Sequence, residues 1–383
     1  MHVVVLGGGY AGLTLTRSLE SDLPDDVEIT LVDESPDHLV QHELHRVIRR
    51  PELANEIRVS LPAALERATV RVARVEEIDR DERVVALSDG SLEYDLVAIC
   101  LGAQTAYYGL EGVPEYGIPL KRLSHARRIR RRALEVVRGD GDRLVVGGAG
   151  LSGVQVAGEL AALVDETAGT ASVTLLEQTE QVAPGFPANF QRALERTLTD
   201  ADVEVRTEAA VVGADADCVR LESGERLPVD AFVWTGGICG PDAFDGDRPV
   251  VSADLRLDEH AFALGDAVRV VDADGTAVPA SAQAAVREAR TAAANIGRLV
   301  EAERADSDAD AFEPRLESFT FDSPGWLVSV GDDAVAQVGP TVLTGRAAKT
   351  LKTTVGVGYL SSVGAVGNAV DRVSREFGSE QSD

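Results

Sequence analysis

Short, continuous apolar runs alternate with amphipathic segments along much of the chain. Residues 2–6 form one such run, and beyond the glycine-rich loop that follows it Ala11, Leu15 and Leu19 recur at the spacing of a helix face. A second apolar run, 27–33, ends at Asp33. Apolar strands without alternation are typical of parallel sheets covered on both faces, so this pattern predicts a strand–helix–strand unit of the Rossmann type.

The same pattern returns downstream. An apolar run at 143–147 leads into a second glycine-rich loop, an amphipathic segment follows, and a further strand at 172–177 ends at Glu177. Two more apolar strands, 94–102 and 229–237, close on Gly102 and on Gly236 with Gly237. The sequence therefore predicts an α/β protein with two Rossmann-like dinucleotide-binding domains.

The rest of the chain divides less sharply. A strand at 261–267 precedes an alanine-rich helix at 281–300. We expect a discontinuous first domain at 1–110 and 243–310, a second domain at 111–242, and a small α+β module at 311–383. In that module apolar residues recur every three or four positions and predict one or two amphipathic helices: Ala348, Leu351, Val355, Tyr359, Val363, Val366, Val370, Val373 and Phe377.

The first glycine-rich loop has the spacing of a pyrophosphate-binding fingerprint. Gly7 permits a tight turn, Gly9 lets the backbone approach a pyrophosphate, and Gly12 allows the helix to pack closely on the strand. The helix start behind them favours an anion. Asp33 follows at a strand end, where a carboxylate accepts hydrogen bonds from a ribose.

The second loop repeats this fingerprint with Gly148, Gly150 and Gly153, and Glu177 is its acidic residue. A carboxylate at that strand end pairs with a free 2′-hydroxyl and repels a 2′-phosphate, so NADH is preferred over NADPH. Two dinucleotide folds imply two dinucleotides, one held permanently and one exchanged. Hydride transfer from a nicotinamide to a flavin is the chemistry that such a pair supports.

Charge changes this picture only at the surface. The 383 residues include 64 acidic and 37 basic residues, which gives a net charge of −27. Such a surface repels nucleic acid. The balance resembles that of proteins from extreme halophiles, in which molar salt screens the repulsion between like charges.

Cys100, Cys218 and Cys239 are isolated and lack the CxxC or CxxxxC spacing of a redox dithiol or a zinc site, so neither is predicted. Isolated cysteines favour a reducing, cytoplasmic location. Cys100 and Cys239 are expected to be small buried apolar residues. No run of about 18 apolar residues exists, so no membrane-spanning helix is expected.

Taken in order, the motifs GGGYAG, YDLVAICLGAQT, VVGGAGLSGVQVAGEL, VDAFVWTGG, AFALGDA and PASAQAA resemble the type II NADH dehydrogenases. The resemblance covers residues 1–340 and implies a three-layer, glutathione-reductase-like fold, with electrons passing from NADH through FAD to a quinone without proton pumping. It implies that FAD contacts Gly7, Gly9, Gly12, Asp33, Gly102, Gly265, Asp266, Ala282 and Gln283. NADH would contact Gly148, Gly150, Gly153, Glu177 and Gly236.

Two departures from the family pattern concern the electron acceptor. The family's motif near the quinone site is matched by Ala282, Gln283 and Ala285, whereas Arg287 replaces its second glutamine. Gln155 occupies a position that is often glutamate, and an amide cannot exchange protons near neutral pH. We expect Gln283, Gln155 and Arg287 to shape the acceptor side of the flavin. Alternatively, Gln283 only satisfies backbone groups where its helix begins, with Ser281 as the expected N-cap.

Several groups have simpler interpretations. His38, His42 and His45 could share one helix face and bind a metal, although packing or solvation is favoured and no metal is predicted. The arginine run, which comprises Arg127, Arg128, Arg130, Arg131 and Arg132, is interpreted as a solvated helix face.

The resemblance leaves partners open. The C-terminal module could attach the protein peripherally to the inner face of the cell membrane, or it could pack on the flavin domain or on a second subunit of a homodimer. The acceptor could instead be a small redox protein or oxygen. A non-catalytic, redox-responsive flavoprotein is the remaining alternative.

Overall fold

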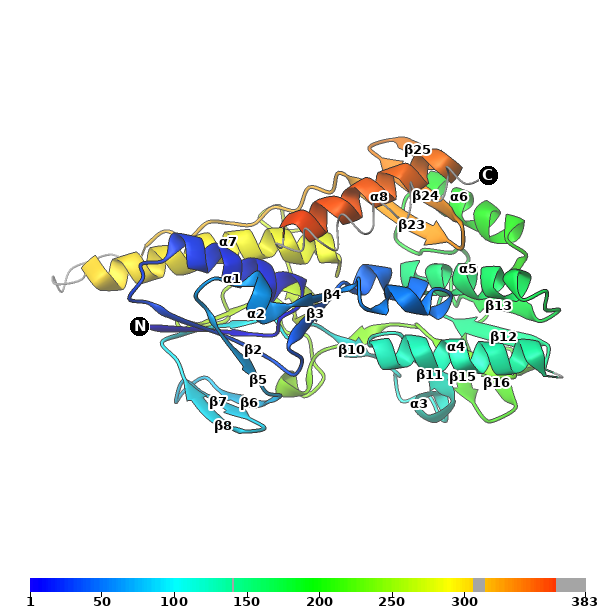
Figure 1. Ribbon diagram of the computed structural model, residues 1–383, viewed down its shortest axis with the longest axis horizontal. Helices are drawn as coiled ribbons and strands as arrows, with labels where there is room; N and C mark the ends of the chain where they lie inside the picture. Colours follow the sequence, from blue (N-terminus) through cyan, green and yellow to red (C-terminus); the bar gives the residue numbers. More distant parts are fainter. Residues whose placement is uncertain (140, 306–313, 363–383) are drawn as a thin grey trace. The chain divides into compact units, whose positions relative to one another are not determined.

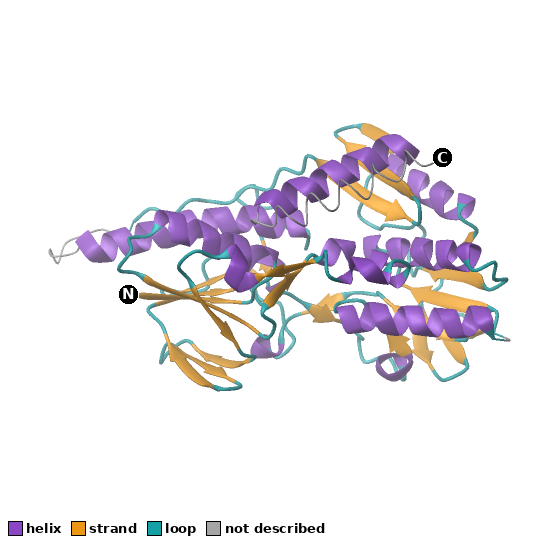
Figure 2. Cartoon of the chain, viewed as in Figure 1, coloured by secondary structure: helices purple, strands orange, loops and turns teal. Residues whose placement is uncertain are grey.

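A computed structural model describes residues 1–139, 141–305 and 314–362. Figure 1 follows the chain from end to end, and Figure 2 marks its helices and strands. The chain forms two compact units, each built from separate stretches of sequence. The first unit comprises 1–40, 58–104 and 239–322, and the second comprises 41–57, 105–238 and the described residues from 323 onward.

A five-stranded parallel sheet forms the centre of the first unit, in the order β21-β9-β1-β2-β5. Its strands are β1 (His2–Leu6), β2 (Glu28–Asp33), β5 (Thr69–Val72), β9 (Leu96–Ile99) and β21 (Ala261–Ala263). Val3, Val4, Val5 and Leu6 are fully buried, as the continuous apolar run predicts. Helices α1 (Tyr10–Asp22) and α7 (Ala282–Ala305) lie side by side against this sheet (Figure 1).

The second unit has an equivalent parallel sheet, in the order β11-β18-β12-β13-β14. Its strands are β11 (Gly117–Ile118), β12 (Arg143–Gly147), β13 (Ser172–Leu176), β14 (Val203–Arg206) and β18 (Ala231–Trp234). Helix α5 (Leu151–Glu166) connects β12 to β13, as α1 connects β1 to β2. The two predicted Rossmann-type units are therefore confirmed.

Smaller sheets and helices complete both units. In the first unit these are β3 (Asp37–Leu39), β4 (Arg58–Ser60), α2 (Leu61–Ala64), β6 (Val75–Asp79), β7 (Val84–Leu87), β8 (Gly90–Glu93), η3 (Asp242–Phe244), β20 (Val250–Val251), η4 (Gly265–Ala267) and β22 (Arg269–Val270). In the second they are η1 (Gln41–Ile48), η2 (Pro51–Ala54), α3 (Val113–Tyr116), α4 (Leu123–Arg138), α6 (Ala188–Asp200), β15 (Val211–Ala214), β16 (Cys218–Leu221), β17 (Arg226–Pro228), β23 (Gly325–Val330), β24 (Asp333–Val338), β25 (Thr341–Thr344) and α8 (Gly345–Ser362). The short strands β10 (Gln104–Thr105) and β19 (Ile238–Cys239) lie where the chain passes between the units.

The domain limits differ in detail from those expected. The chain passes from one unit to the other at 104/105 and 238/239, where the sequence placed the junctions at 110/111 and 242/243. The C-terminal strands β23, β24 and β25 group with the second unit, and so do residues 41–57. Of the amphipathic pattern at 348–377, the part up to Ser362 lies in α8. The positions from Val363 onward lie outside the described residues.

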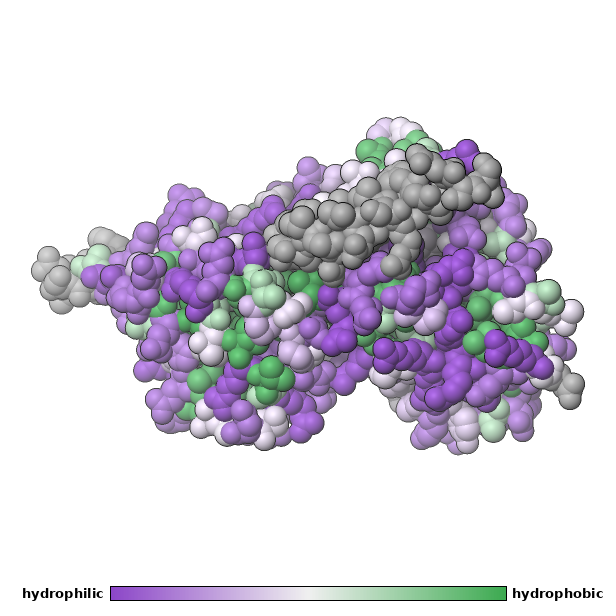
Figure 3. Space-filling view, viewed as in Figure 1, coloured by the Kyte–Doolittle hydropathy of each residue, from purple (hydrophilic) through white to green (hydrophobic). Residues whose placement is uncertain are grey.

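The surface reflects the composition. Hydrophilic residues predominate on the face seen in Figure 3. Large apolar side chains that are exposed, such as Val72, Tyr108 and Val250, come from different elements. Among the described residues no helix is both long and apolar enough to cross a bilayer.

Candidate functional site: two glycine cradles

The loop between β1 and α1 has the three glycine roles that the fingerprint requires. Gly7 has φ +99°, and a Cβ there would lie 2.4 Å from the carbonyl oxygen of Cys100. A Cβ on Gly12 would lie 1.8 Å from the Gly7 oxygen. A Cβ on Gly9 would meet no atom within 4 Å, so the backbone there faces open space. The first and third glycines are needed for packing, and the second leaves room for a ligand.

The loop between β12 and α5 has the same geometry. Gly148 has φ +93°, and its Cβ would lie 2.7 Å from the Cα of Gly236. A Cβ on Gly153 would lie 1.8 Å from the Gly148 oxygen, whereas one on Gly150 would meet nothing within 4 Å. We call these two loops the first and second glycine cradles.

Each cradle opens at the start of a long helix. Gly9 and Gly150 are the N-caps of α1 and α5, neither has a side-chain capping bond, and neither helix has an acidic residue in its first turn. The first amides of a helix have no partner within it and carry partial positive charge. Both cradles therefore suit the pyrophosphate of a dinucleotide.

A carboxylate at the end of the next strand holds each loop. Asp33 Oδ2 accepts a hydrogen bond of 2.6 Å from the Gly8 amide, and Glu177 Oε2 accepts one of 2.9 Å from the Ala149 amide. In both cases the donor directly follows the first glycine. The sequence predicted where these carboxylates lie and that they would bind a ligand. It did not predict that they also hold the glycine-rich loops in place. Ribose binding by Asp33 and Glu177 stays a prediction.

Two further predicted FAD contacts, Gly265 and Asp266, lie on η4. Gly265 has φ +71°, and a Cβ there would lie 3.4 Å from Ala11 Cβ and 3.7 Å from Ala285 Cβ. The loop carrying Asp266 therefore packs against the beginnings of both α1 and α7. Arg248 fixes it further, since Nε donates to the Asp266 carbonyl at 2.7 Å. Sequence reasoning missed Arg248, which no motif marks.

The predicted acceptor-side residues come from both units. Ser281 Oγ accepts a 3.2 Å hydrogen bond from the Ala284 amide, so the predicted N-cap of α7 is present. Gln283 and Arg287 lie on the first turns of α7, and Gln155 is a half-buried residue of α5. Arg287 donates to the Asp322 carbonyl, and its guanidinium lies 5.8 Å from the centroid of the Phe321 ring. Ala282 begins α7, and Gly102 has φ +68° after β9.

The histidines do not form a helix face. His38 lies in β3, whereas His42 and His45 lie in η1, so the assumption of one shared helix is wrong. His38 Nδ1 lies 3.0 Å from the Gly8 oxygen of the first cradle, and His45 Nε2 lies 2.7 Å from Ser329 Oγ. Burial lowers the pKa of His45 well below its usual value. Among the described residues no cluster of His, Cys, Asp and Glu has the geometry of a metal site.

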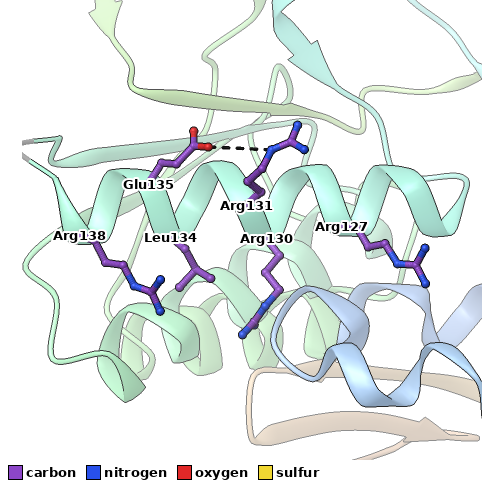
Figure 4. Close-up of a pocket in the computed structure, with 6 residues that line it drawn as sticks. All are labelled: Arg127, Arg130, Arg131, Leu134, Glu135 and Arg138. Carbon is purple, nitrogen blue, oxygen red and sulfur yellow. Dashed lines mark ion pairs between the residues drawn. The ribbon is translucent and has the colours of Figure 1, made fainter.

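The arginine run of α4 is mostly exposed, as predicted. Arginine stems, Leu134 and Glu135 line a surface hollow of about 500 Å³ (Figure 4). Arg130 donates to the carbonyls of Ile48 and Arg49, and Arg132 pairs with Glu135 at 2.7 Å. No predicted cofactor residue lines this hollow.

Two parallel-sheet units that each carry a glycine cradle and a matching carboxylate define a protein that binds two dinucleotides. Residues 1–289 match the pyridine nucleotide-disulphide oxidoreductases, and the chain belongs to this family. It is an FAD-dependent oxidoreductase, and the predicted cofactor pair of FAD and NADH is confirmed. All three cysteines are described and free; Cys100 is buried as predicted, whereas Cys239 is only half-buried. Burial raises the pKa of the Cys100 thiol.

Individual relatives agree with this assignment. The chain is 25% identical to the type II NADH:quinone oxidoreductase of Staphylococcus aureus (strain MSSA476), with 96% of this chain and 97% of that protein covered. Its fold is similar to that of NDH2 from Plasmodium falciparum in complex with NADH, with a TM-score of 0.82, 14% identity and 98% of each chain covered. Its fold is also similar to that of the sulfide:quinone oxidoreductase of Aquifex aeolicus, with a TM-score of 0.78 and 19% identity, and with 96% of this chain and 92% of that chain covered. At these identities the two structures show a shared fold.

Proposed function

We propose that this protein oxidises NADH and passes the electrons through FAD to a quinone, without pumping protons. The observation that carries the proposal is the pair of glycine cradles, one in each unit, each with a carboxylate bonded to its loop. The similarity to a type II NADH:quinone oxidoreductase over nearly the whole chain supports the quinone as acceptor.

In this proposal each unit has one task. Gly7, Gly9, Gly12, Asp33 and Asp266 hold FAD, which supplies two-electron chemistry when bound. Gly148, Gly150, Gly153, Glu177 and Gly236 hold NADH. Asp33 and Glu177 hold the two loops through hydrogen bonds to Gly8 and Ala149, which limits the freedom that the loop residues would lose on binding.

On the acceptor side, α7 presents its N-terminus and Gln283, with Arg287 one turn later. The helix dipole stabilises negative charge near this end. Gln155 can donate or accept a hydrogen bond but cannot carry a proton, so the proton needed to complete quinol comes from another group or from water.

A non-quinone acceptor is the second candidate, and Arg287 favours it. Where the family pattern has a glutamine, this side chain is bound to the Asp322 carbonyl and lies over Phe321. A small redox protein or oxygen would then take the electrons. We expect peripheral attachment to the inner face of the cell membrane if the quinone is the acceptor.

Acceptor comparison tests both candidates. Purified holoenzyme is supplied with NADH and, in turn, with menadione, ferricyanide or oxygen. Faster NADH oxidation with menadione than with ferricyanide or oxygen supports a quinone acceptor. NADH oxidation with ferricyanide but not with menadione supports a protein acceptor. A yellow protein whose flavin NADH does not bleach would be the non-catalytic alternative. Reconstituted into vesicles, the enzyme should turn over without acidifying or alkalinising the lumen.

A further inference from the structure

Glu288 is a buried carboxyl group in the first unit that no step above uses. It lies in the second turn of α7 and is 2% exposed. Its Oε2 accepts a hydrogen bond of 2.6 Å from the amide of Gly265. Gly265 directly precedes Asp266, the residue assigned to FAD. Glu288 is therefore hydrogen-bonded to the loop that is proposed to bind the cofactor.

Gly265 lies close to the beginnings of two helices. A Cβ placed there would be in ordinary van der Waals contact with Ala11 of α1 and Ala285 of α7, at 3.4 and 3.7 Å. Because α1 begins at the first glycine cradle, the Gly265 amide and its partner Glu288 lie close to that cradle.

The charged and titratable groups that act on Glu288 are Asp266, Arg248 and Cys100. Asp266 adds like charge. Arg248 adds opposite charge, but its guanidinium also donates hydrogen bonds to the carbonyls of Asp266 and Val268, each at 2.7 Å. Burial, with Asp266 as a smaller cause, raises the pKa of Glu288 from 4.5 to about 7, although the Gly265 amide acts against this. Near neutral pH the carboxyl is therefore poised between its two forms.

We propose that Glu288 is the redox-linked proton site of the FAD-binding unit: it takes up one proton when electrons enter the flavin held there and releases it when they leave. Electrons arriving from NADH add negative charge to the unit, and negative charge disfavours a second anion nearby. The proton comes from solvent, the carboxylate becomes a neutral acid, and no covalent bond to the cofactor forms. The inference depends on FAD binding and not on which acceptor takes the electrons.

The test is the flavin midpoint potential of the holoenzyme, measured anaerobically from about pH 5.5 to 8.5. For a two-electron couple a tenfold change in an equilibrium constant equals 29.6 mV, so one extra proton adds about 30 mV per pH unit to the slope. We expect the wild type to be steeper than Glu288→Gln by up to that amount around pH 7. Equal slopes would overturn the proposal.

Glutamine is suited to this test because its carbonyl oxygen still accepts from the Gly265 amide. A purely structural role would therefore leave the slope unchanged. Glu301→Gln is the matched control, since Glu301 is exposed on the same helix and the chemical change is identical. It should keep the wild-type slope.

A second measurement keeps the proposal testable if Glu288→Gln loses FAD. The reduced-minus-oxidised infrared difference spectrum of the wild-type holoenzyme at pH 7 should show a protonated carboxyl band appearing as a carboxylate band is lost. Reduction without any carboxyl band refutes proton uptake by Glu288.

Discussion

Replacing Glu177 by glutamine tests the second cradle with little change in shape. The carboxylate is 5% exposed and accepts three hydrogen bonds, from the Ala149 amide at 2.9 Å, the Thr179 amide at 3.0 Å and the Thr179 hydroxyl at 3.1 Å. A glutamine offers one oxygen in place of two. The NH2 group of the glutamine must then face the backbone amide of either Ala149 or Thr179. Both are hydrogen-bond donors, so one of them loses its acceptor.

The size of the effect on NADH binding follows from the hydrogen bond that the carboxylate is proposed to accept from the ribose. A hydrogen bond to a charged group contributes about 1.5–3 kcal/mol, and an unsatisfied buried donor costs about 1–3 kcal/mol. A loss of about 1.5–3 kcal/mol in NADH binding corresponds to a KM raised by ~10 to ~150-fold at 1.4 kcal/mol per tenfold. Discrimination against NADPH should also weaken, because the negative charge that repels a 2′-phosphate is gone.

The assay is steady-state NADH and NADPH oxidation with menadione, together with the FAD content per chain. Asp33→Asn is the matched control, because Asp33 holds the first cradle in the same way. It should lower FAD content while leaving the KM for NADH of the loaded fraction within about twofold. A Glu177→Gln enzyme with unchanged KM, or one that loses FAD instead, would refute the assignment of the cradles.

Other predictions separate binding from folding. Gly150→Ala should raise the KM for NADH with little change in Tm, because its Cβ meets no protein atom within 4 Å, whereas Gly153→Ala should lower Tm because its Cβ would lie 1.8 Å from the Gly148 oxygen; the reverse order of Tm values would contradict this. The pKa of Glu288 rises from 4.5 to about 7 on folding. Its protonated form therefore contributes stability below the unfolded pKa, and this contribution is lost as pH rises through about 7. Relative to wild type, Glu288→Gln should gain stability between pH 5 and pH 8, by about 3 kcal/mol at most. Urea unfolding at pH 5 and at pH 8 measures this, and a difference in unfolding free energy between the two proteins that does not change with pH would contradict the prediction. With a net charge of −27, Tm should rise from low to molar KCl, and a flat or falling Tm would count against adaptation to high salt.

The local elements could be predicted because their signals are local. Gly12 and Gly153 are required by close contacts with the oxygens of Gly7 and Gly148 a few residues earlier, so spacing identifies them. Gly7 and Gly148 are required by their positive φ, which the tight turn of the fingerprint predicts, whereas their close approach to Cys100 and Gly236 needs the fold. The partner of Asp33 could not be predicted from spacing, because its bond to Gly8 joins residues 25 positions apart.

Longer-range features needed the fold. Glu288 resembles any glutamate on an alanine-rich helix until Gly265 is seen to donate to it. Residues 41–57 lie within the sequence of the first Rossmann unit yet group with the second, because packing rather than order along the chain decides membership. His38 and His42 were separated by a strand end that helical spacing does not reveal.

Anaerobic titration of the purified protein with NADH tests the central claim most directly. If the two cradles hold FAD and NADH for electron transfer, about one equivalent of NADH per bound flavin should bleach the flavin absorbance, and NADPH should do so only at much higher concentration. Flavin absorbance that stays unchanged through excess NADH would contradict the account.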